Sequence, residues 1–331
     1  MKTRNYLSLI AACLLLPVIA SGCSNDFSPS EEALPDAGVP VPISVEVASI
    51  NAEVSTRAAI DKGNMGVYLA STNGYTPKYN APYSYSGGKW TSASPINVGG
   101  QTASLYAYYP YDAALGTSAA GTSVPLTAQK YGADKALCYA TSPVESAVKN
   151  TSPSVSFAMQ HAYARLQFVI TRNNSVDDAY NGGDCKVTKI ELASTAGSIY
   201  TSGSLDMTKT LSAGAAPNPS VSGAAATYTF STSGSILTSG IAAGATDSST
   251  DYLFPPQTFS GDFNLSVSVD GLTLKATIPA ASLPALTSGT ITKININLQA
   301  LNITVTVSSA TIGSDYTNGG SITGGGEIPL S

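Results

Sequence analysis

Short strand-like segments separated by turn residues recur along most of this chain, and they limit the folds that it can adopt. No segment keeps a helical period for more than about 10 residues, whereas about a third of an average globular protein is helical. Clusters of Gly, Pro, Asn and Ser interrupt the apolar runs. The sequence therefore predicts an all-β protein. The expected strands are Met65–Ala70, Ala103–Tyr109, Leu137–Ala140, Val155–Thr171, Lys186–Leu192, Ser198–Leu205, Thr227–Ser231, Tyr252–Phe254, Ile291–Leu298 and Leu301–Val307.

Two further regions carry hairpin signals. The Tyr-rich stretch Tyr75–Trp90 contains Gly87-Gly88 as its turn, and Asp270-Gly271 separates Phe263–Val269 from Leu272–Ile278. Asp-Gly between two alternating runs is a strong short-range hairpin signal. Many short strands at this spacing favour β-sandwiches.

The composition favours an exported β protein. Charged residues make up only 11% of the 331 residues, and 18 tyrosines stand against one tryptophan and one histidine. The surface is therefore expected to be neutral and rich in hydroxyl groups. The formal net charge is −5, and no basic patch is present in the sequence to neutralise phosphates, so nucleic-acid binding is disfavoured.

The first 22 residues have the features of a signal peptide. Lys2 and Arg4 precede an apolar run, Tyr6–Ala20, that is short for a membrane span. The run ends at Ile19-Ala20-Ser21-Gly22-Cys23, which resembles a bacterial lipobox. We therefore expect residues 1–22 to be removed and Cys23 to carry the lipid. The alternative is ordinary signal cleavage with Cys23 incidental.

Residues 24–42 are rich in proline and acidic residues and form a predicted tether. The strand predicted after it changes the phase of its apolar alternation. In Ile43–Ala58, Ile43, Val45 and Val47 alternate with smaller or polar residues, and after Ser49 the apolar set moves to Ile50, Ala52 and Val54. Such a change implies a bulge or a bend. Arg57 then precedes the small residue Ala58, a combination that a trypsin-like protease can cut. A strand that is cut away would leave an apolar groove.

The expected organisation has four parts. Residues 1–22 are the signal, 23–57 the lipidated tether with a removable strand, 58–154 a first β-sandwich and 155–331 a second. The boundary is placed near Pro153, where a Tyr-rich half gives way to a Ser/Thr-rich half; a boundary near Asn173 is the alternative.

Several stretches in this order resemble the fimbrillin-like (Mfa-like) lipoproteins of Gram-negative gut and oral anaerobes, the subunits of type V pili. They are STRA at Ser55–Ala58 followed by MGVYLA, LYAYYPYD at Leu105–Asp112, FAMQHAYARLQFVI at Phe157–Ile170 and DYLFPPQTF at Asp251–Phe259. The resemblance implies two tandem transthyretin-like seven-stranded β-sandwich domains. It also implies a lipoprotein precursor whose N-terminal strand is removed by an Arg-specific or trypsin-like protease.

The same resemblance implies partners and a location. The vacated groove would be filled by the C-terminal strand of another pilin subunit, and the precursor would reach the outer membrane through its lipid. The donor candidates in this chain are Leu301, Ile303, Val305 and Val307. Two alternatives stay open, a permanent strand at this position and a donor within Ala310–Ser331. A stalk, tip, accessory or anchor role is compatible with these features, and a host or bacterial surface ligand is a further expected partner.

Catalytic and metal chemistry have little support in the sequence. His161 is the only histidine, and a single strand histidine is usually structural. Cys138 and Cys185 can pair or remain free thiols, and they cannot supply four soft metal ligands. The loop carboxylates, among them Asp177 and Asp178, are interpreted as solvated turn residues. We expect no enzyme activity, no cofactor and no metal.

An aromatic group supports the alternative function. Tyr75, Tyr79, Tyr83, Tyr85 and Trp90 fall within one short region, and exposed rings can stack on sugars. The alternative is therefore a surface lipoprotein that binds glycans through Tyr83, Tyr85 and Trp90. Packing in half-buried strands is the competing interpretation.

Overall fold

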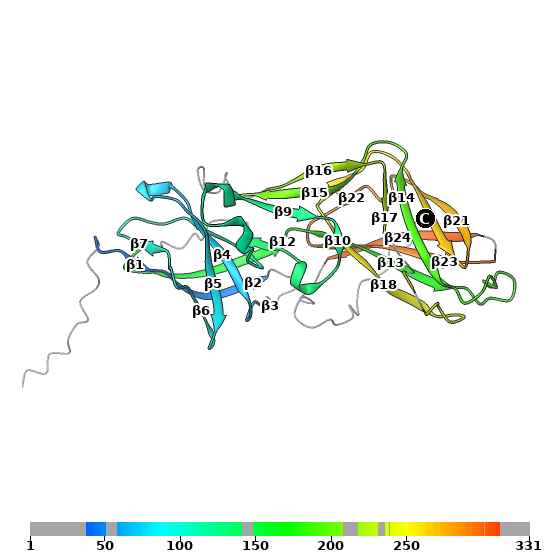
Figure 1. Cartoon of the computed structure of the whole chain (residues 1–331), viewed down its shortest axis with the longest axis horizontal. Helices are drawn as coiled ribbons and strands as arrows, with labels where there is room; N and C mark the ends of the chain where they lie inside the picture. Colours follow the sequence, from blue (N-terminus) through cyan, green and yellow to red (C-terminus); the bar gives the residue numbers. More distant parts are fainter. Residues whose placement is uncertain are drawn as a thin grey trace, which may run out of the picture. The chain divides into compact units, whose positions relative to one another are not determined.

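The computed structural model describes residues 38–50, 58–140, 148–207, 218–230, 236–237, 239–300 and 302–311. Among these residues, β-strands form six sheets, and the helical segments that they contain are short 3₁₀ turns (Figure 1). The fold is all-β, as predicted. The 3₁₀ turns are η1 (Thr72–Gly74), η2 (Ala113–Leu115), η3 (Ala119–Thr122) and η4 (Ala133–Lys135).

The largest sheet has eight strands in the described residues and contains β2, which lies in the predicted removable strand. Its order is β3-β2-β12-β11-β8-β4-β5-β6. The bounds are β3 (Ala58–Ala59), β2 (Ser44–Ile50), β12 (Ser154–His161), β11 (Cys138–Ala140), β8 (Leu105–Tyr109), β4 (Asn64–Leu69), β5 (Lys78–Ser86) and β6 (Lys89–Thr91). A two-stranded sheet pairs β1 (Val41–Pro42) with β7 (Asn97–Val98).

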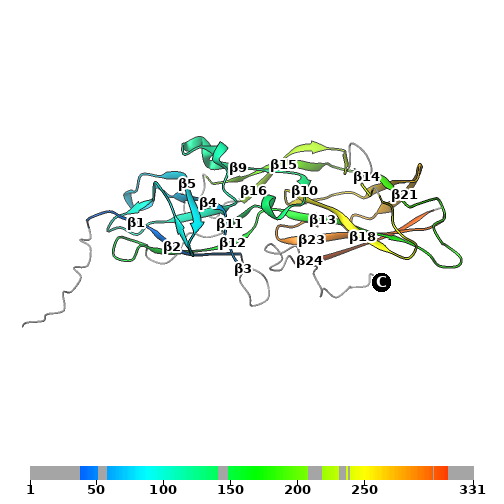
Figure 2. The same cartoon turned by 60° about the horizontal axis from the view of Figure 1, so that its bottom comes forward.

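The later part of the chain supplies most of the other sheets (Figure 2). The five-stranded sheet has the order β10 (Gln129–Lys130), β18 (Thr246–Phe254), β13 (Ala164–Arg172), β23 (Thr290–Leu298) and β24 (Ile303–Thr311). The four-stranded sheet has the order β17 (Thr227–Thr229), β14 (Val187–Ser194), β20 (Phe263–Val269) and β21 (Leu272–Ile278). The remaining two sheets are β16 (Asn218–Ala225), β15 (Ile199–Asp206) and β9 (Ser123–Thr127), and β19 (Gln257–Thr258) with β22 (Ala285–Leu286).

Both predicted hairpins are present. β20 and β21 have the predicted bounds and are joined by Asp270 (φ 47°) and Gly271 (φ 82°), both left-handed as a tight hairpin requires. Gly87 and Gly88 likewise have positive φ between β5 and β6. At these turns the local sequence determines the structure.

The strand predicted over Val155–Thr171 is wrong as a single element. β12 ends at His161, and β13 begins at Ala164 in a different sheet. The buried side chains change parity at this break, as the sequence pattern also does. Between the two strands the backbone N–H of Ala162 donates to the carbonyl of Leu137 at 2.8 Å. The chain therefore passes from one sheet to another at this point.

Two clusters of buried apolar residues form the core. The first is built mainly from residues between Ile43 and Tyr163, and the second from residues between Ala164 and Ile303. β12, which the predicted boundary near Pro153 assigns to the second domain, packs in the first cluster. Division into two tandem seven-stranded sandwiches stays a prediction.

Candidate functional site

β2 lies between β12 and β3 in the eight-stranded sheet. It runs parallel to β12, with Ser44 opposite Ser154 and Ile50 opposite Met159, and it meets the short β3 in antiparallel orientation. Just before the strand, the N–H of Ile43 donates to the carbonyl of Ile96 at 2.9 Å. β2 is therefore paired on both sides within the sheet.

One face of this strand is buried. Ile43, Val45, Ala48 and Ile50 are between 2% and 6% exposed, whereas Val47 is 47% exposed. The register with β12 shifts between Val155 and Ser156, where Val47 rather than Glu46 follows in the pairing. The predicted change of phase exists, but the bulge precedes Val47 instead of following Ser49. The sequence pattern placed Val47 in the apolar set with Ile43 and Val45, and the structure corrects this, because Val47 is exposed to solvent.

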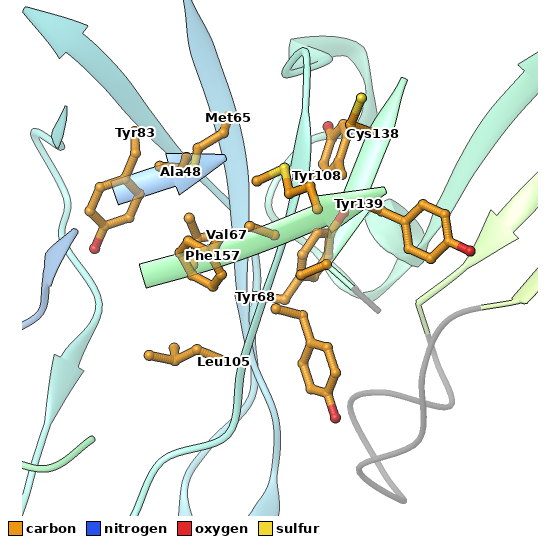
Figure 3. Packing of buried hydrophobic residues seen from close by; sticks show 14 of the residues in the cluster. Ala48, Met65, Val67, Tyr68, Tyr83, Leu105, Tyr108, Cys138, Tyr139 and Phe157 are labelled. Carbon is orange, nitrogen blue, oxygen red and sulfur yellow. The ribbon is translucent and has the colours of Figure 1, made fainter. Parts of the chain in front are cut away.

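Beneath the strand lies the first hydrophobic cluster. Ala48 faces Phe157 across the sheet, and Figure 3 shows it among Met65, Val67 and Phe157. Burial of a Val or Ile side chain, such as Val45 or Ile50 of β2, stabilises a fold by about 1.5–3 kcal/mol. We call the surface that β2 covers, which consists of the β12 edge with Phe157 and of Met65 and Val67, the β2 groove.

A cavity of 460 Å³ lies at the C-terminal end of β2. Ile50, Ile60, Tyr109 and Cys138 are among the residues that line it. Ala58 is in β3, opposite Ile50. Val54 and Arg57, the predicted end of the removable strand and the predicted cut site, lie outside the described residues, as does the predicted lipidation site Cys23.

The predicted donor strand lies in the five-stranded sheet. β24 pairs with β23 along its whole length, from Ile303 opposite Leu298 to Thr311 opposite Thr290. Ile303 is buried, and Val305 and Val307 pack against the second cluster. Leu301 lies outside the described residues. The donor role of these residues stays a prediction.

The exposed aromatic surface that the sequence suggested does not form. Tyr83 is 1% exposed and Trp90 is 5% exposed, because both pack into the first cluster. The Tyr83 hydroxyl accepts a hydrogen bond from the N–H of Ile96 at 2.9 Å, and half-buried Tyr85 contacts the Trp90 ring edge-on at 5.3 Å. Packing is thus the correct interpretation for Tyr83 and Trp90.

His161 is a core residue. It lies buried opposite Cys138, with 3.1 Å between its Nδ1 and the Cys138 Sγ. Burial, and secondarily the charge of Arg165, lowers the pKa of His161 to about 4, so the ring is neutral near pH 7. Burial raises the pKa of the Cys138 thiol. A neutral imidazole and a protonated thiol do not make an activated nucleophile.

The remaining candidates for chemistry are dispersed. Cys138 and Cys185 are both buried free thiols. Asp177 and Asp178 are exposed. Within the described part of the chain, no group of three or more His, Cys, Asp or Glu side chains is placed to hold a metal ion.

One buried ion pair was not anticipated. Arg165 of β13 and Asp251 of β18 are 2.5 Å apart (Nη2 to Oδ2), and the Arg165 guanidinium lies 3.7 Å over the Tyr131 ring. The N–H of Tyr131 donates to the backbone carbonyl of Asp251 at 2.8 Å. Part of the signal was present in the sequence, since Arg165 interrupts the apolar run of HAYARLQF and Asp251 directly precedes that of YLFPP.

Comparison with solved structures supports this architecture. A candidate cell adhesion protein from Bacteroides uniformis has a TM-score of 0.57 at 15% identity, covering 84% of this chain and 100% of its own. A second, from Bacteroides ovatus, has a TM-score of 0.54 at 19% identity, covering 82% and 96%. At such identities the likeness establishes the fold alone.

Sequence comparison identifies the family. Among curated proteins, none is a significant match. The family model described as fimbrillin-like, however, matches residues 55–314, which is most of the chain. The match includes the strands from β3 to β24 and thus nearly all of both hydrophobic clusters. The chain therefore belongs to the fimbrillin-like family.

Proposed function

We propose that this protein is a structural subunit (stalk, tip or accessory) of a cell-surface pilus, exported as a lipoprotein precursor and assembled by strand exchange after cleavage at Arg57. Membership of the fimbrillin-like family supports a role in a pilus or in cell adhesion at the surface. The role is structural rather than catalytic. Its partners are other pilin subunits, and before assembly the lipid on Cys23 holds it to the outer membrane.

The observation that carries the proposal is the position of β2. The strand pairs in parallel with β12, which is distant in sequence, and on its other side with the two-residue β3. A cut after Arg57 would therefore leave β2 held by non-covalent contacts alone. Its departure would expose the β12 edge and the β2 groove, and an incoming strand could restore both the hydrogen bonds and the buried side chains.

The donor in this scheme is a strand of another subunit. β24 is already paired with β23, so Ile303, Val305 and Val307 could act as donors only after β24 leaves its sheet. The segment that follows Thr311 lies outside the described residues and is the second candidate.

Limited proteolysis tests the proposal. We expect trypsin to cut the purified precursor after Arg57, to release residues up to 57 and to yield oligomers. Arg57→Gln should remain monomeric under the same treatment. Lys62→Gln is the matched control, because it removes an exposed neighbouring trypsin site and leaves Arg57 intact.

Two results would contradict the proposal. One is a chain cut at Arg57 that releases its N-terminal segment and stays monomeric. The other is an Arg57→Gln variant that assembles as well as the wild type. Sequencing the N-terminus of the protein on cells adds a further check, since an anchor subunit would keep Arg57 uncut.

A further inference from the structure

A groove of 870 Å³ lies away from the β2 groove. Residues from six strands line it: Tyr139 of β11, Gln160 of β12, Tyr200 of β15, Val221 of β16, Gln257 of β19 and Leu286 of β22 are among them. Figure 3 shows the Tyr139 ring pointing away from Phe157 and Leu105, unlike the core rings on the other side of the sheet. Tyr139 is nevertheless 3% exposed and belongs to the first cluster, so the rings that the groove presents are those of half-buried Tyr200 and Phe259.

Among the described residues, none that lines the groove carries a charge. The described lining side chains are aromatic, aliphatic, proline, hydroxyl or amide. A ligand with a formal charge would lose hydration on entering without gaining an ion pair. A purely apolar ligand would leave the amides and hydroxyls without partners. Lining of this kind fits a neutral molecule that has both C–H faces and many hydroxyl groups.

The polar groups in the groove are held in place. The Gln160 Nε2 donates to the Tyr139 hydroxyl at 2.6 Å. That hydroxyl can still donate its own proton, and the Gln160 carbonyl oxygen is an acceptor. On the opposite wall, Gln257 accepts from the N–H of Tyr200 at 2.7 Å and donates to its carbonyl at 3.0 Å. These bonds fix the backbone that carries the Tyr200 ring, so little ordering is required when a ligand binds.

Backbone pairing limits strand addition by a peptide to the sheet-edge strands β16, β19 and β22, which also line the groove. Peptides commonly bind β-proteins by adding a strand to a free edge. β11, β12 and β15, which supply Tyr139, Gln160 and Tyr200, are each paired on both sides. Recognition at these strands must therefore come from side chains.

We propose that this groove binds a neutral oligosaccharide, with the rings of Tyr200 and Phe259 against its C–H faces and with Gln160 and the Tyr139 hydroxyl as hydrogen-bonding groups. The site is separate from the aromatic group of Tyr83, Tyr85 and Trp90. It goes beyond the pilus function and does not depend on assembly.

The test is an array that carries neutral, sialylated and sulfated oligosaccharides together with uncharged proline-rich peptides. The array is probed with the purified full chain. We expect binding to neutral glycans, weakened roughly tenfold by Tyr200→Ala through loss of a stacked ring. Gln160→Glu keeps the side-chain size, places a charge in the groove and should weaken binding similarly. Tyr85→Ala truncates a half-buried strand tyrosine outside the groove and should leave binding unchanged.

Any of three outcomes would overturn the proposal. They are the absence of binding to every neutral glycan, binding to charged glycans or peptides only, and equal losses of glycan binding in Tyr85→Ala and Tyr200→Ala. If Tyr200→Ala does not fold, as judged by thermal unfolding, Gln160→Glu decides alone. Because the trypsin assay measures assembly separately, failure here is distinguishable from failure of the pilus function.

Discussion

At the residue scale, tyrosine and asparagine side chains tie loops to the sheets. The Asn80 amide lies in the core with φ 47°, donates to the carbonyls of Asp112 and Gly116 at 3.0 Å each, and accepts from the Tyr108 hydroxyl at 2.8 Å. The Tyr68 hydroxyl donates to the Gly121 carbonyl at 2.7 Å. Asparagine tolerates the left-handed conformation better than most residues. Many of the tyrosines are therefore explained by loop anchoring.

Asp270 has a similar role at the β20–β21 hairpin. Its carboxylate accepts from the N–H groups of Cys185 and Lys186 at 2.7 and 2.9 Å and from the Tyr180 hydroxyl at 2.9 Å. Burial acts to raise the pKa of Asp270, but these hydrogen bonds outweigh it and lower the pKa below its usual 3.8. The charged carboxylate thus stabilises the end of the 173–185 loop.

We predict that Asp270→Asn destabilises the protein at neutral pH and changes its acid sensitivity. Because the folded pKa lies below the unfolded one, the carboxylate contributes stability above about pH 4 and loses it as the pH falls further. At pH 7 the variant should lose about 1 kcal/mol, a value reduced for partial exposure. Urea unfolding from pH 7 to pH 3 measures this, and a difference that grows toward pH 3 would contradict it.

These residue roles were only partly readable from the sequence. The Asp-Gly turn was evident, because its signal is local. The contacts of Asp270 with Tyr180 and Cys185 were not, because they join positions about 90 residues apart. The burial of Trp90 was likewise undetermined, since an aromatic strand residue can face either side of a sheet.

At the scale of the element, β2 shows how one bulge changes which side chains are buried. Simple alternation would bury Val47 and expose Ala48. The shift in register against β12 reverses both assignments. A sequence pattern alone cannot locate such a bulge when small residues such as Ala48 and Ser49 can occupy either face.

We predict that Val45→Ala and Val47→Ala differ in their effects on the precursor. Val45 is 3% exposed, so its truncation should lower the free energy of unfolding by about 2 kcal/mol. Val47→Ala, at an exposed position, should change it by less than about 0.5 kcal/mol. Equilibrium denaturation of the uncut protein provides the measurement. Equal losses for the two variants would mean that the alternation continues through Glu46 without a bulge.

Other elements show where sequence patterns succeed. β20 and β21 were predicted with their observed bounds, because each alternates cleanly beside a strong turn. β9 and β16 were missed, because Pro125 in one and Pro219 with Gly223 in the other weaken the strand pattern. Proline is tolerated in a sheet where its missing N–H is not needed, which propensity alone does not reveal.

At the scale of the whole molecule, strands from one half of the sequence pair with strands from the other. β9 pairs with β15, and β10 pairs with β18. Tyr131, directly after β10, covers the buried Arg165–Asp251 pair. A domain boundary near Pro153 does not predict these strand pairings. It was placed from local amino-acid composition, which carries no information on pairing between distant segments.

We predict that Arg165→Met is strongly destabilising and that a second substitution rescues it. Loss of the guanidinium leaves the Asp251 carboxylate buried without its partner, at a cost of about 3–5 kcal/mol. Arg165→Met with Asp251→Leu removes both charges and should restore most of that stability. Thermal unfolding of the two single variants and the double variant forms a complete cycle. Additive losses in the double variant would contradict this account.

The parallel pairing of β2 also bears on the order of folding. Ser44 meets Ser154, 110 residues later in the chain, so this contact closes a long loop and carries a large entropic cost before any gain from pairing. During synthesis, the partner of β2 emerges only after β4, β5 and β8 have been made. The N-terminal strand would then be among the last parts to dock, onto a sheet whose other members are already in place. If β2 docks late, the edge of β12 stays unpaired until then, which is the state that the proposed strand exchange requires.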